Sequence, residues 1–215
     1  MKIRIKWLRG LLSQRGGVRP VAGFLIIPLL FFSVLGADAA SGRGTERLPV
    51  TFSEKCSLTI LEDGAYWRAL NEAIEQARDE ITLAFFYFKT KGGRGSYPDL
   101  ILASLADAAK RGVRVVVLLE QGRDQEESTT VANRQTANWL RKKGVTVYLD
   151  DPQRTMHTKI AVVDGKNTFI GSHNLTQSAL KYNREISVLI KSPQVAAEVR
   201  DYIKSIMVTA VPGVK

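Results

Sequence analysis

Side chains suited to phosphodiester chemistry are concentrated in residues 156–176, which read MHTKIAVVDGKNTFIGSHNLT. His157 and Lys159 begin an apolar run of strand length, and alternate residues of a strand face the same side. An imidazole can attack phosphorus or donate a proton, and an ammonium neutralises the non-bridging phosphate oxygens. Ser172 and Asn174 follow the next short apolar run and offer hydroxyl and amide donors to the same phosphate.

The spacing of these residues is more specific than a lone His-x-Lys pair. It resembles the HKD signature of the phospholipase D superfamily at six positions, which are His157, Lys159, Asp164, Gly171, Ser172 and Asn174. Six fixed positions match a given starting point by chance about once in 10⁸ trials. The length, order of elements, leader and single motif are similar to those of the small secreted bacterial endonucleases of the superfamily.

The resemblance implies hydrolysis without a metal or other cofactor, through a covalent phosphohistidine. In the family one motif histidine attacks phosphorus, and a second protonates the leaving oxygen and then activates water. This chain carries one such motif, so the second histidine must come from another chain. We therefore expect a homodimer whose active site lies on the two-fold axis, with His157 and Lys159 from each protomer.

The resemblance also assigns roles to two carboxylates, both counted among the catalytic residues. In the related nucleases a glutamate at the place of Glu185 orients the motif histidine through its second ring nitrogen. Asp164 completes the signature, but it lies between the apolar run 160–163 and Gly165. We therefore expect Asp164 to brace the turn rather than contact phosphate.

The remaining reactive side chains have weaker support. His173 is not followed by x-Lys, so we expect a loop or rim side chain beside the motif. A zinc site formed by His157, His173 and Cys56 lacks any usual ligand spacing, so no metal site is predicted. Cys56 is the only cysteine and is expected to be a free thiol.

An aromatic run, FFYF at residues 85–88, could stack nucleobases, but buried strand aromatics are commoner. We expect core residues with one alternating side able to reach the cleft. Lys89, Lys91 and Arg94 follow on a glycine-rich loop. This loop is either a rail for a phosphate backbone or simply a soluble loop, and the sequence favours neither.

Strands and helices alternate around these residues. The hydrophobic patterns predict helices at 65–78, 98–111 and 129–143 and a C-terminal helix with an apolar stripe at Val195, Val199, Tyr202 and Ile206. They predict strands at 81–88, 113–119, 145–149, 159–164, 168–171 and 186–190. The expected fold is α/β, with a mixed β-sheet sandwiched between helices in a phospholipase D-like domain.

The N-terminal region has the three parts of a secretory signal peptide. Residues 1–20 are basic, residues 21–36 are apolar, and the small-x-small site at 37–39 allows cleavage after Ala39. We predict a signal peptide at 1–39, a linker at 40–49, the catalytic domain at 50–207 and a tail at 208–215. Export to the periplasm or medium follows, the alternative being an inner-membrane anchor through residues 21–36.

The composition excludes several classes of protein. A chain of 215 residues that is 45% hydrophobic and has one cysteine is neither disordered, collagen-like nor a disulfide-rich mini-protein. Six Lys and Arg against one Asp give the leader a charge of +5, half of the net +10. The rest of the chain is mildly cationic, which fits an anionic partner without requiring one.

We therefore predict a non-specific endonuclease acting on DNA or RNA. The alternative is a phospholipase D that releases phospholipid head groups, since fold and motif do not settle the substrate. Lipid-acting relatives usually carry two motifs on a much longer chain. A non-enzymatic binding protein is less favoured, because every position of the signature is intact.

Overall fold

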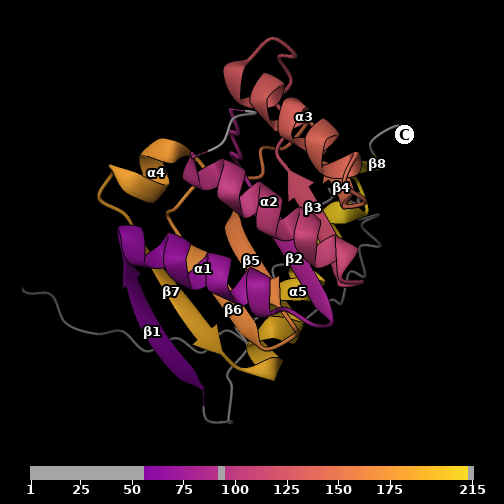
Figure 1. Cartoon of the computed structure of the whole chain (residues 1–215). Coiled ribbons are helices and arrows are strands. Elements are labelled where there is room, and N and C mark those ends of the chain that lie inside the picture. Colours follow the sequence, from indigo (N-terminus) through magenta and orange to yellow (C-terminus); the bar gives the residue numbers. More distant parts are fainter. Residues whose placement is uncertain (1–55, 92–94, 213–215) are drawn as a thin grey trace, which may run out of the picture. The chain divides into compact units, whose positions relative to one another are not determined.

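The computed structural model describes residues 56–91 and 95–212 (Figure 1). The predicted signal peptide and linker, the first residues of the predicted domain, and Arg94 lie outside these ranges. The described elements, in chain order, are β1 (Ser57–Glu62), α1 (Gly64–Gln76), β2 (Glu80–Phe85), α2 (Tyr97–Lys110), β3 (Arg114–Leu119), α3 (Ser128–Arg141), β4 (Thr146–Leu149), β5 (Lys159–Val163), β6 (Asn167–Gly171), α4 (Gln177–Lys181), β7 (Ile186–Lys191), α5 (Pro193–Met207) and β8 (Val211–Pro212).

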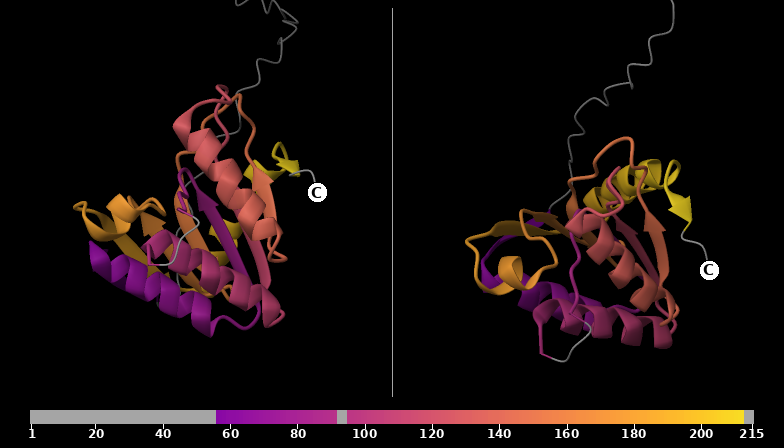
Figure 2. Two further views of the ribbon diagram at one scale, coloured as in Figure 1. Left: turned by 45° about the horizontal axis from the view of Figure 1, so that its top comes forward. Right: turned by 90° about the horizontal axis from the view of Figure 1, so that it is seen from above.

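The described strands form one mixed sheet in the order β1-β7-β6-β5-β2-β3-β4-β8. The strands β2, β3 and β4 are parallel, and the remaining neighbours are antiparallel. The helices α1, α2 and α3 cover one face of the sheet and α5 covers part of the other (Figure 2). The predicted α/β fold, a mixed sheet between helices, is confirmed.

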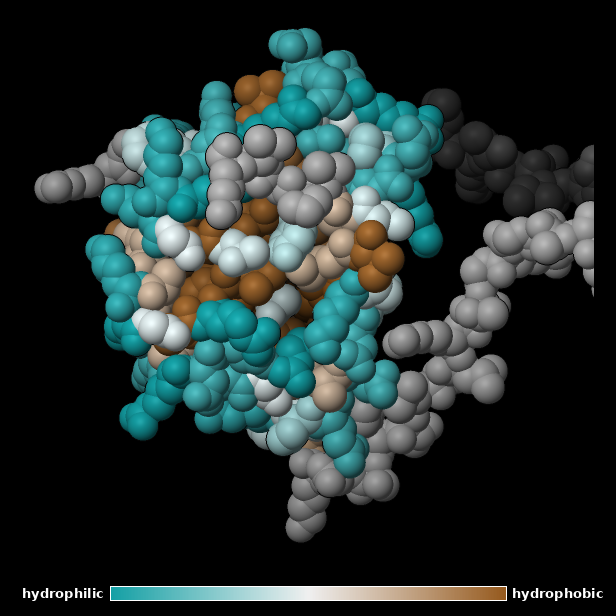
Figure 3. Space-filling view, turned by 90° about the vertical axis from the view of Figure 1, so that its right-hand side faces the viewer, coloured by the Kyte–Doolittle hydropathy of each residue, from teal (hydrophilic) through white to brown (hydrophobic). Residues whose placement is uncertain are grey.

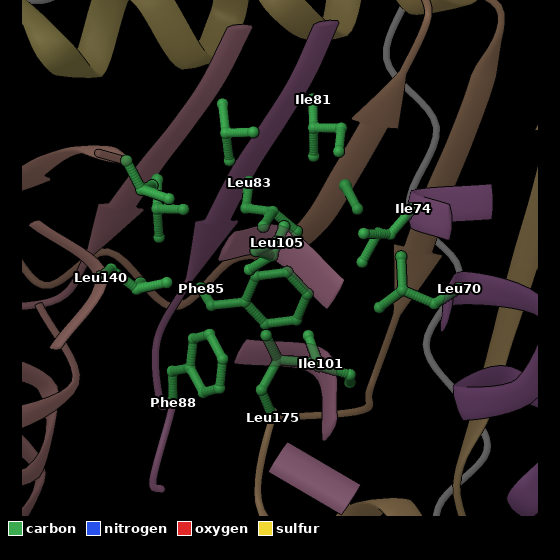
Figure 4. Packing of buried hydrophobic residues seen from close by; sticks show 14 of the residues in the cluster. Leu70, Ile74, Ile81, Leu83, Phe85, Phe88, Ile101, Leu105, Leu140 and Leu175 are labelled. Atoms are coloured by element: carbon green, nitrogen blue, oxygen red, sulfur yellow. The ribbon is translucent and has the colours of Figure 1, made fainter. Parts of the chain in front are cut away.

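The larger hydrophobic core lies between the sheet and helices α1 to α3. Alternate side chains of β2, from Ile81 to Phe85, point into this core and are fully buried. They meet fully buried leucine and isoleucine side chains of α1 and α2, as Figure 4 shows for Leu70, Ile74, Ile101 and Leu105. The intervening Ala84 points to the opposite face and packs in the smaller core under α5.

Three of the described elements have no counterpart among the sequence predictions. In β1 only Leu61 is buried, because β1 is an edge strand with one face open. The helix α4 spans five residues, too few for a helical hydrophobic period to show. Residues 208–215 were expected to form a tail, but Val211 and Pro212 form β8 beside β4.

The strand register brings the ends of four strands to one edge of the sheet. Phe85, the last residue of β2, pairs with Lys159, the first residue of β5. Gly171, the last residue of β6, pairs with Ser187 near the start of β7. The motif residues that follow Gly171 therefore lie at the same edge of the sheet as Lys159.

Gly171 is required by the close approach of β6 to β7. A Cβ atom at this position would overlap Cα of Ser187, and a backbone atom cannot rotate out of the way. We expect Gly171→Ala to lower the free energy of unfolding by about 1–3 kcal/mol. Urea unfolding measures this, with Gly64→Ala as the control because its Cβ would meet only the end of Arg68 at 3.4 Å. Equal stability of the two variants would contradict the expectation.

Apolar side chains are exposed on two parts of the described surface. Figure 3, which faces the side of β4, β8 and α3, shows hydrophobic atoms gathered in a hollowed central area with a hydrophilic border. Elsewhere on the surface, three apolar side chains are at least half exposed: Leu58 at 57%, Ile60 at 50% and Ile186 at 56%. Among the described helices, none has the length and hydrophobicity needed to cross a membrane.

Candidate active site

His157 and Lys159 lie together at the entry to β5. The ammonium nitrogen of Lys159 is 3.2 Å from Nδ1 of His157 and donates to the backbone oxygen of His157 at 2.9 Å. Lys159 is 7% exposed, whereas His157 is exposed. The pair therefore presents an accessible imidazole backed by a buried cation.

The aromatic run at residues 85–88 divides between the core and this pair. Phe85 and Phe88 are fully buried, as expected for core residues. The ring of Phe86 instead lies 4.5 Å from the imidazole of His157, and the Lys159 ammonium lies 5.0 Å from the Phe86 ring centre. One side of the run thus reaches the site and packs against its two reactive groups.

The surroundings lower the pKa of both reactive groups. Burial, and secondarily the positive charge of Lys159, hold the pKa of His157 below its ordinary value. Burial also lowers the pKa of Lys159, while the negative charge of Glu185 acts in the opposite direction. The structure therefore favours a neutral imidazole, the form that can act as a nucleophile or base.

This pKa has a consequence for activity against pH. An imidazole whose pKa is below the ordinary 6.5 stays neutral at lower pH than a free histidine does. If the neutral His157 of one protomer attacks phosphorus and the protonated His157 of the other donates the proton, kcat/KM should pass through a maximum whose acid limb lies below pH 6.5. A pH–rate profile measures this, and an acid limb centred above pH 6.5 would contradict it.

Ser172 and Glu185 lie together at the ends of β6 and β7. The Ser172 hydroxyl donates to the Glu185 carboxylate and accepts from the backbone N–H of Ile186 at 3.1 Å. The other carboxylate oxygen of Glu185 accepts from Asn183 at 3.0 Å. The Ser172 hydroxyl, predicted to bind phosphate, is therefore already engaged within the protomer.

Glu185 was expected to orient His157 by a hydrogen bond. Among the described residues its carboxylate instead binds Ser172 and Asn183, and Nδ1 of His157 faces Lys159. The physical reason is the strand order, because β6 lies between β5 and β7. Two strand spacings amount to about 10 Å, so the Glu185 side chain meets the end of β6 first.

Asn174 lies near the same edge of the sheet, between the buried His173 and Leu175. Its Oδ1 atom is buried and has no hydrogen-bond partner among the described residues. A buried amide oxygen without a partner costs free energy. The hydrogen bonding of this motif side chain is thus not completed by the described part of the chain.

Asp164 lies at the end of β5 opposite to Lys159. Its carboxylate accepts from the backbone N–H groups of Arg78, Asp79 and Glu80, at 3.1, 2.9 and 3.2 Å. Burial acts to raise the pKa of Asp164, but these donors outweigh it and the pKa is lowered. Asp164 therefore braces the turn before β2, away from the reactive pair, and is not placed to take part in catalysis.

His173 is a buried structural residue and not the rim side chain that was expected. It is fully buried, its Nδ1 is 2.7 Å from the Ser187 hydroxyl, and its Nε2 is 3.0 Å from the backbone oxygen of Asp63. Its ring stacks on Tyr66 at 4.3 Å, and burial lowers its pKa. The reason is strand-like alternation, which turns His173 inward between Ser172 and Asn174.

A pocket of about 340 Å³ opens beside His157. Its lining mixes polar and apolar side chains from the segment before β5 and from α5; it includes Asp150, Asp151, Arg154, Met156, Tyr202 and Ile206. Sequence analysis missed these residues, because Tyr202 and Ile206 were assigned to an apolar helix stripe and the others carry no motif. The arrangement offers a space of mixed polar and apolar lining next to the reactive imidazole.

The matches to known proteins agree with this geometry. Residues 70–207 match the family described as cardiolipin synthase, PLD-like domain. The chain belongs to the phospholipase D superfamily. Among members of the superfamily, cardiolipin synthase B of Escherichia coli K12 is 32% identical over 135 residues, which are 62% of this chain and 30% of that protein. Phospholipase D of Rickettsia bellii is 28% identical over 125 residues, 58% of this chain and 55% of that protein.

Solved structures of the superfamily share the fold. The phospholipase D family member Nuc from Salmonella typhimurium has a TM-score of 0.61 at 21% identity, covering 73% of this chain and 97% of Nuc. NucT from Helicobacter pylori has a TM-score of 0.59 at 18% identity, covering 74% of this chain and 99% of NucT. The matched region thus spans less than a third of the length of the cardiolipin synthases, whereas it covers nearly the whole length of Nuc and NucT.

Three further side chains that the sequence analysis considered lie at the surface. Cys56 is an exposed free thiol, and Lys89 and Lys91 are exposed. Within the described ranges, His, Cys, Asp and Glu side chains form no group of three that could hold a metal ion. Metal independence stays a prediction.

Proposed function

We propose that this protein is a non-specific endonuclease that hydrolyses DNA or RNA without a metal ion. The proposal is carried by the exposed imidazole of His157 next to the buried ammonium of Lys159. The motif and the fold shared with Nuc and NucT support the same reading.

The proposed reaction has two displacements at phosphorus. Lys159 leaves Nδ1 of His157 to bind a non-bridging oxygen, which allows Nδ1 to hold the proton and Nε2 to attack. A P–N bond forms while the bond to the leaving oxygen breaks, and His157 of the second protomer supplies the proton. That histidine then takes a proton from water, which attacks phosphorus and breaks the P–N bond. Asn174 donates to the phosphate.

We propose a homodimer formed through the outer face of β1 and β7. Leu58 and Ile60 point away from the core that holds Leu61, and they lie opposite Ile190 and Val188 of β7. Seen from above in Figure 2, β1 and β7 extend beyond the cover of α5. Ile186 continues this apolar face to the sheet edge, where it lines a pocket with Ser172 and Glu185. A second copy here would bring two sites together.

A phospholipid substrate is the second candidate. It is favoured by the 32% identity to cardiolipin synthase B, which exceeds the identity to Nuc or NucT. The reaction at phosphorus would be the same, with a head group as the leaving group. A purely binding function has less support, because the motif residues are present and His157 is accessible.

Export to the periplasm or medium is part of the proposal. It rests on the N-terminal pattern of basic, apolar and small residues, and the alternative is an anchor through residues 21–36. Fractionation of cells, with immunoblotting for a shortened chain, would separate the two.

Plasmid DNA incubated with the purified protein in excess EDTA tests the function. We expect nicking and linearisation that EDTA leaves unchanged and that rising salt weakens, because contacts to the phosphate backbone release counterions. Labelled phospholipid vesicles run in parallel. Cleavage of DNA that stops on chelation would contradict metal independence, and head-group release without DNA cleavage would favour the phospholipase.

A further inference from the structure

The helix α3 points a row of buried polar side chains at the ends of two strands. Thr130, Asn133 and Thr136 are all fully buried and are spaced three residues apart on one face of the helix. The hydroxyl of Thr130 accepts from the backbone N–H of Gly122 at 2.9 Å. The hydroxyl of Thr136 donates to the backbone oxygen of Phe88 at 2.7 Å. These groups lie just past the ends of β2 and β3.

Asn133 is the centre of this row. Its Nδ2 donates to the backbone oxygens of Phe86 at 2.8 Å and Glu120 at 2.9 Å, and its Oδ1 accepts from the N–H of Phe88 at 2.9 Å. Both amide hydrogens and the amide oxygen are thus in use. A buried amide with all of its donors paired fixes the relative position of the groups it joins.

Asn133 binds the backbone carbonyls of Phe86 and Glu120. These two residues in turn bind the chain on either side of His157. The N–H of Phe86 donates to the backbone oxygen of Thr158 at 2.8 Å. The carboxylate of Glu120, which is 3% exposed, accepts from the N–H of Met156 at 2.7 Å. The residues before and after His157 are therefore each bonded to a residue that Asn133 fixes.

Two contacts of the His157 side chain within the described ranges are the Lys159 ammonium at 3.2 Å and the Phe86 ring at 4.5 Å. The direction of the His157 ring therefore depends on where the backbone of 156–158 and the ring of Phe86 are held. Both depend on Asn133.

We propose that Asn133 is a positioning residue for His157, acting through Phe86 and Glu120. Asn133 lies 24 residues before His157 in the chain and outside the HKD signature. This inference rests on the proposed function in one respect, which is that His157 is the reacting group. Loss of the Asn133 bonds widens the range of imidazole orientations, so turnover falls through kcat while substrate binding by Lys159 is retained.

Two substitutions test the proposal on the purified protein with plasmid DNA. Asn133→Ala removes all three bonds, and Asn133→Asp keeps the shape while a carboxyl group can donate to only one of the two carbonyls. We expect kcat to fall about 10-fold or more for both, with KM changed by less than about 3-fold. Asn138→Ala, on the exposed side of the same helix, should leave both constants unchanged.

Thr136→Val controls for loss of stability alone. It breaks the bond to Phe88 but none to Phe86 or Glu120, so it should lower the melting temperature while kcat stays close to that of the parent. An equal loss of kcat in Thr136→Val and Asn133→Ala, at equal loss of stability, would overturn the positioning role.

Proton NMR of the imidazoles gives a readout that needs no substrate. The chain has two histidines, so His157 and His173 can be followed separately. In Asn133→Ala we expect the pKa of His157 to rise toward 6.5, because the desolvating contacts loosen, while the buried His173 stays unchanged. An unchanged His157 titration would overturn the proposal. The titration needs no substrate, so it tests the positioning role of Asn133 even if the protein does not cut DNA.

Discussion

His157→Ala is expected to abolish phosphodiester hydrolysis, lowering kcat by about 10³-fold or more. Alanine offers no lone pair to attack phosphorus and no proton for the leaving oxygen. The side chain is exposed and its loss empties no core space, so the melting temperature should stay close to that of the parent. Plasmid nicking and thermal unfolding measure the two quantities. Activity within 10-fold of that of the parent, in a variant whose melting temperature matches that of the parent, would contradict the proposed mechanism.

His173→Ala is the matched comparison, because it removes the same residue type from a buried position after β6 instead of from the reactive pair. His173 bonds Ser187 and the backbone oxygen of Asp63 and stacks on Tyr66. Its loss should lower the melting temperature, with specific activity of the folded fraction retained. The two histidines should thus separate catalysis from stability.

Ile60→Asp is expected to dissociate the homodimer and with it to remove nearly all activity. Ile60 is half exposed in the protomer, and the proposed interface would bury it against a second copy. An unpaired carboxylate in an apolar interface costs enough to weaken association by about 100-fold or more. Size-exclusion chromatography with light scattering measures the mass, and the plasmid assay measures activity.

Leu100→Asp is the control for this substitution. Leu100 is 41% exposed on α2, away from β1 and β7, so the same change of type should leave mass and activity unaltered. A monomeric parent with full activity would contradict the shared site. So would a dimer that persists in Ile60→Asp.

Mixed dimers test the same idea from the catalytic side. Equal amounts of parent and His157→Ala chains, unfolded and refolded together, pair at random, so about one quarter of the dimers hold two His157 side chains. Activity should therefore be about one quarter of that of the parent alone. A value near one half would indicate that each protomer works independently.

Much of the fold follows from local hydrophobic patterns. The run Ile81–Phe85 is apolar except for Thr82 because β2 is covered on both faces, and Leu70 and Ile74 show the helical period of α1. The edge strand β1 escaped prediction because it is short and has one open face, so that only Leu61 of its six residues is buried.

The sequence by itself determined the superfamily, the reactive pair and the fold class. His157 and Lys159 are two residues apart on one strand, and local geometry alone puts them together. The turn after β5 is also local, because Asp164 and Gly165 both have positive φ angles, but the backbone donors that Asp164 binds lie 84 to 86 residues away in the chain.

Only the tertiary structure decided what surrounds the pair. Asn133 lies on α3, Glu120 follows β3 and Phe86 follows β2, and the strand order together with the packing of α3 brings them together near His157. The same order places β6 between Glu185 and His157, which sends the Glu185 carboxylate to Ser172. Contacts across a sheet depend on which strands are neighbours, and that order is set by the packing of the whole domain rather than by spacing along the chain.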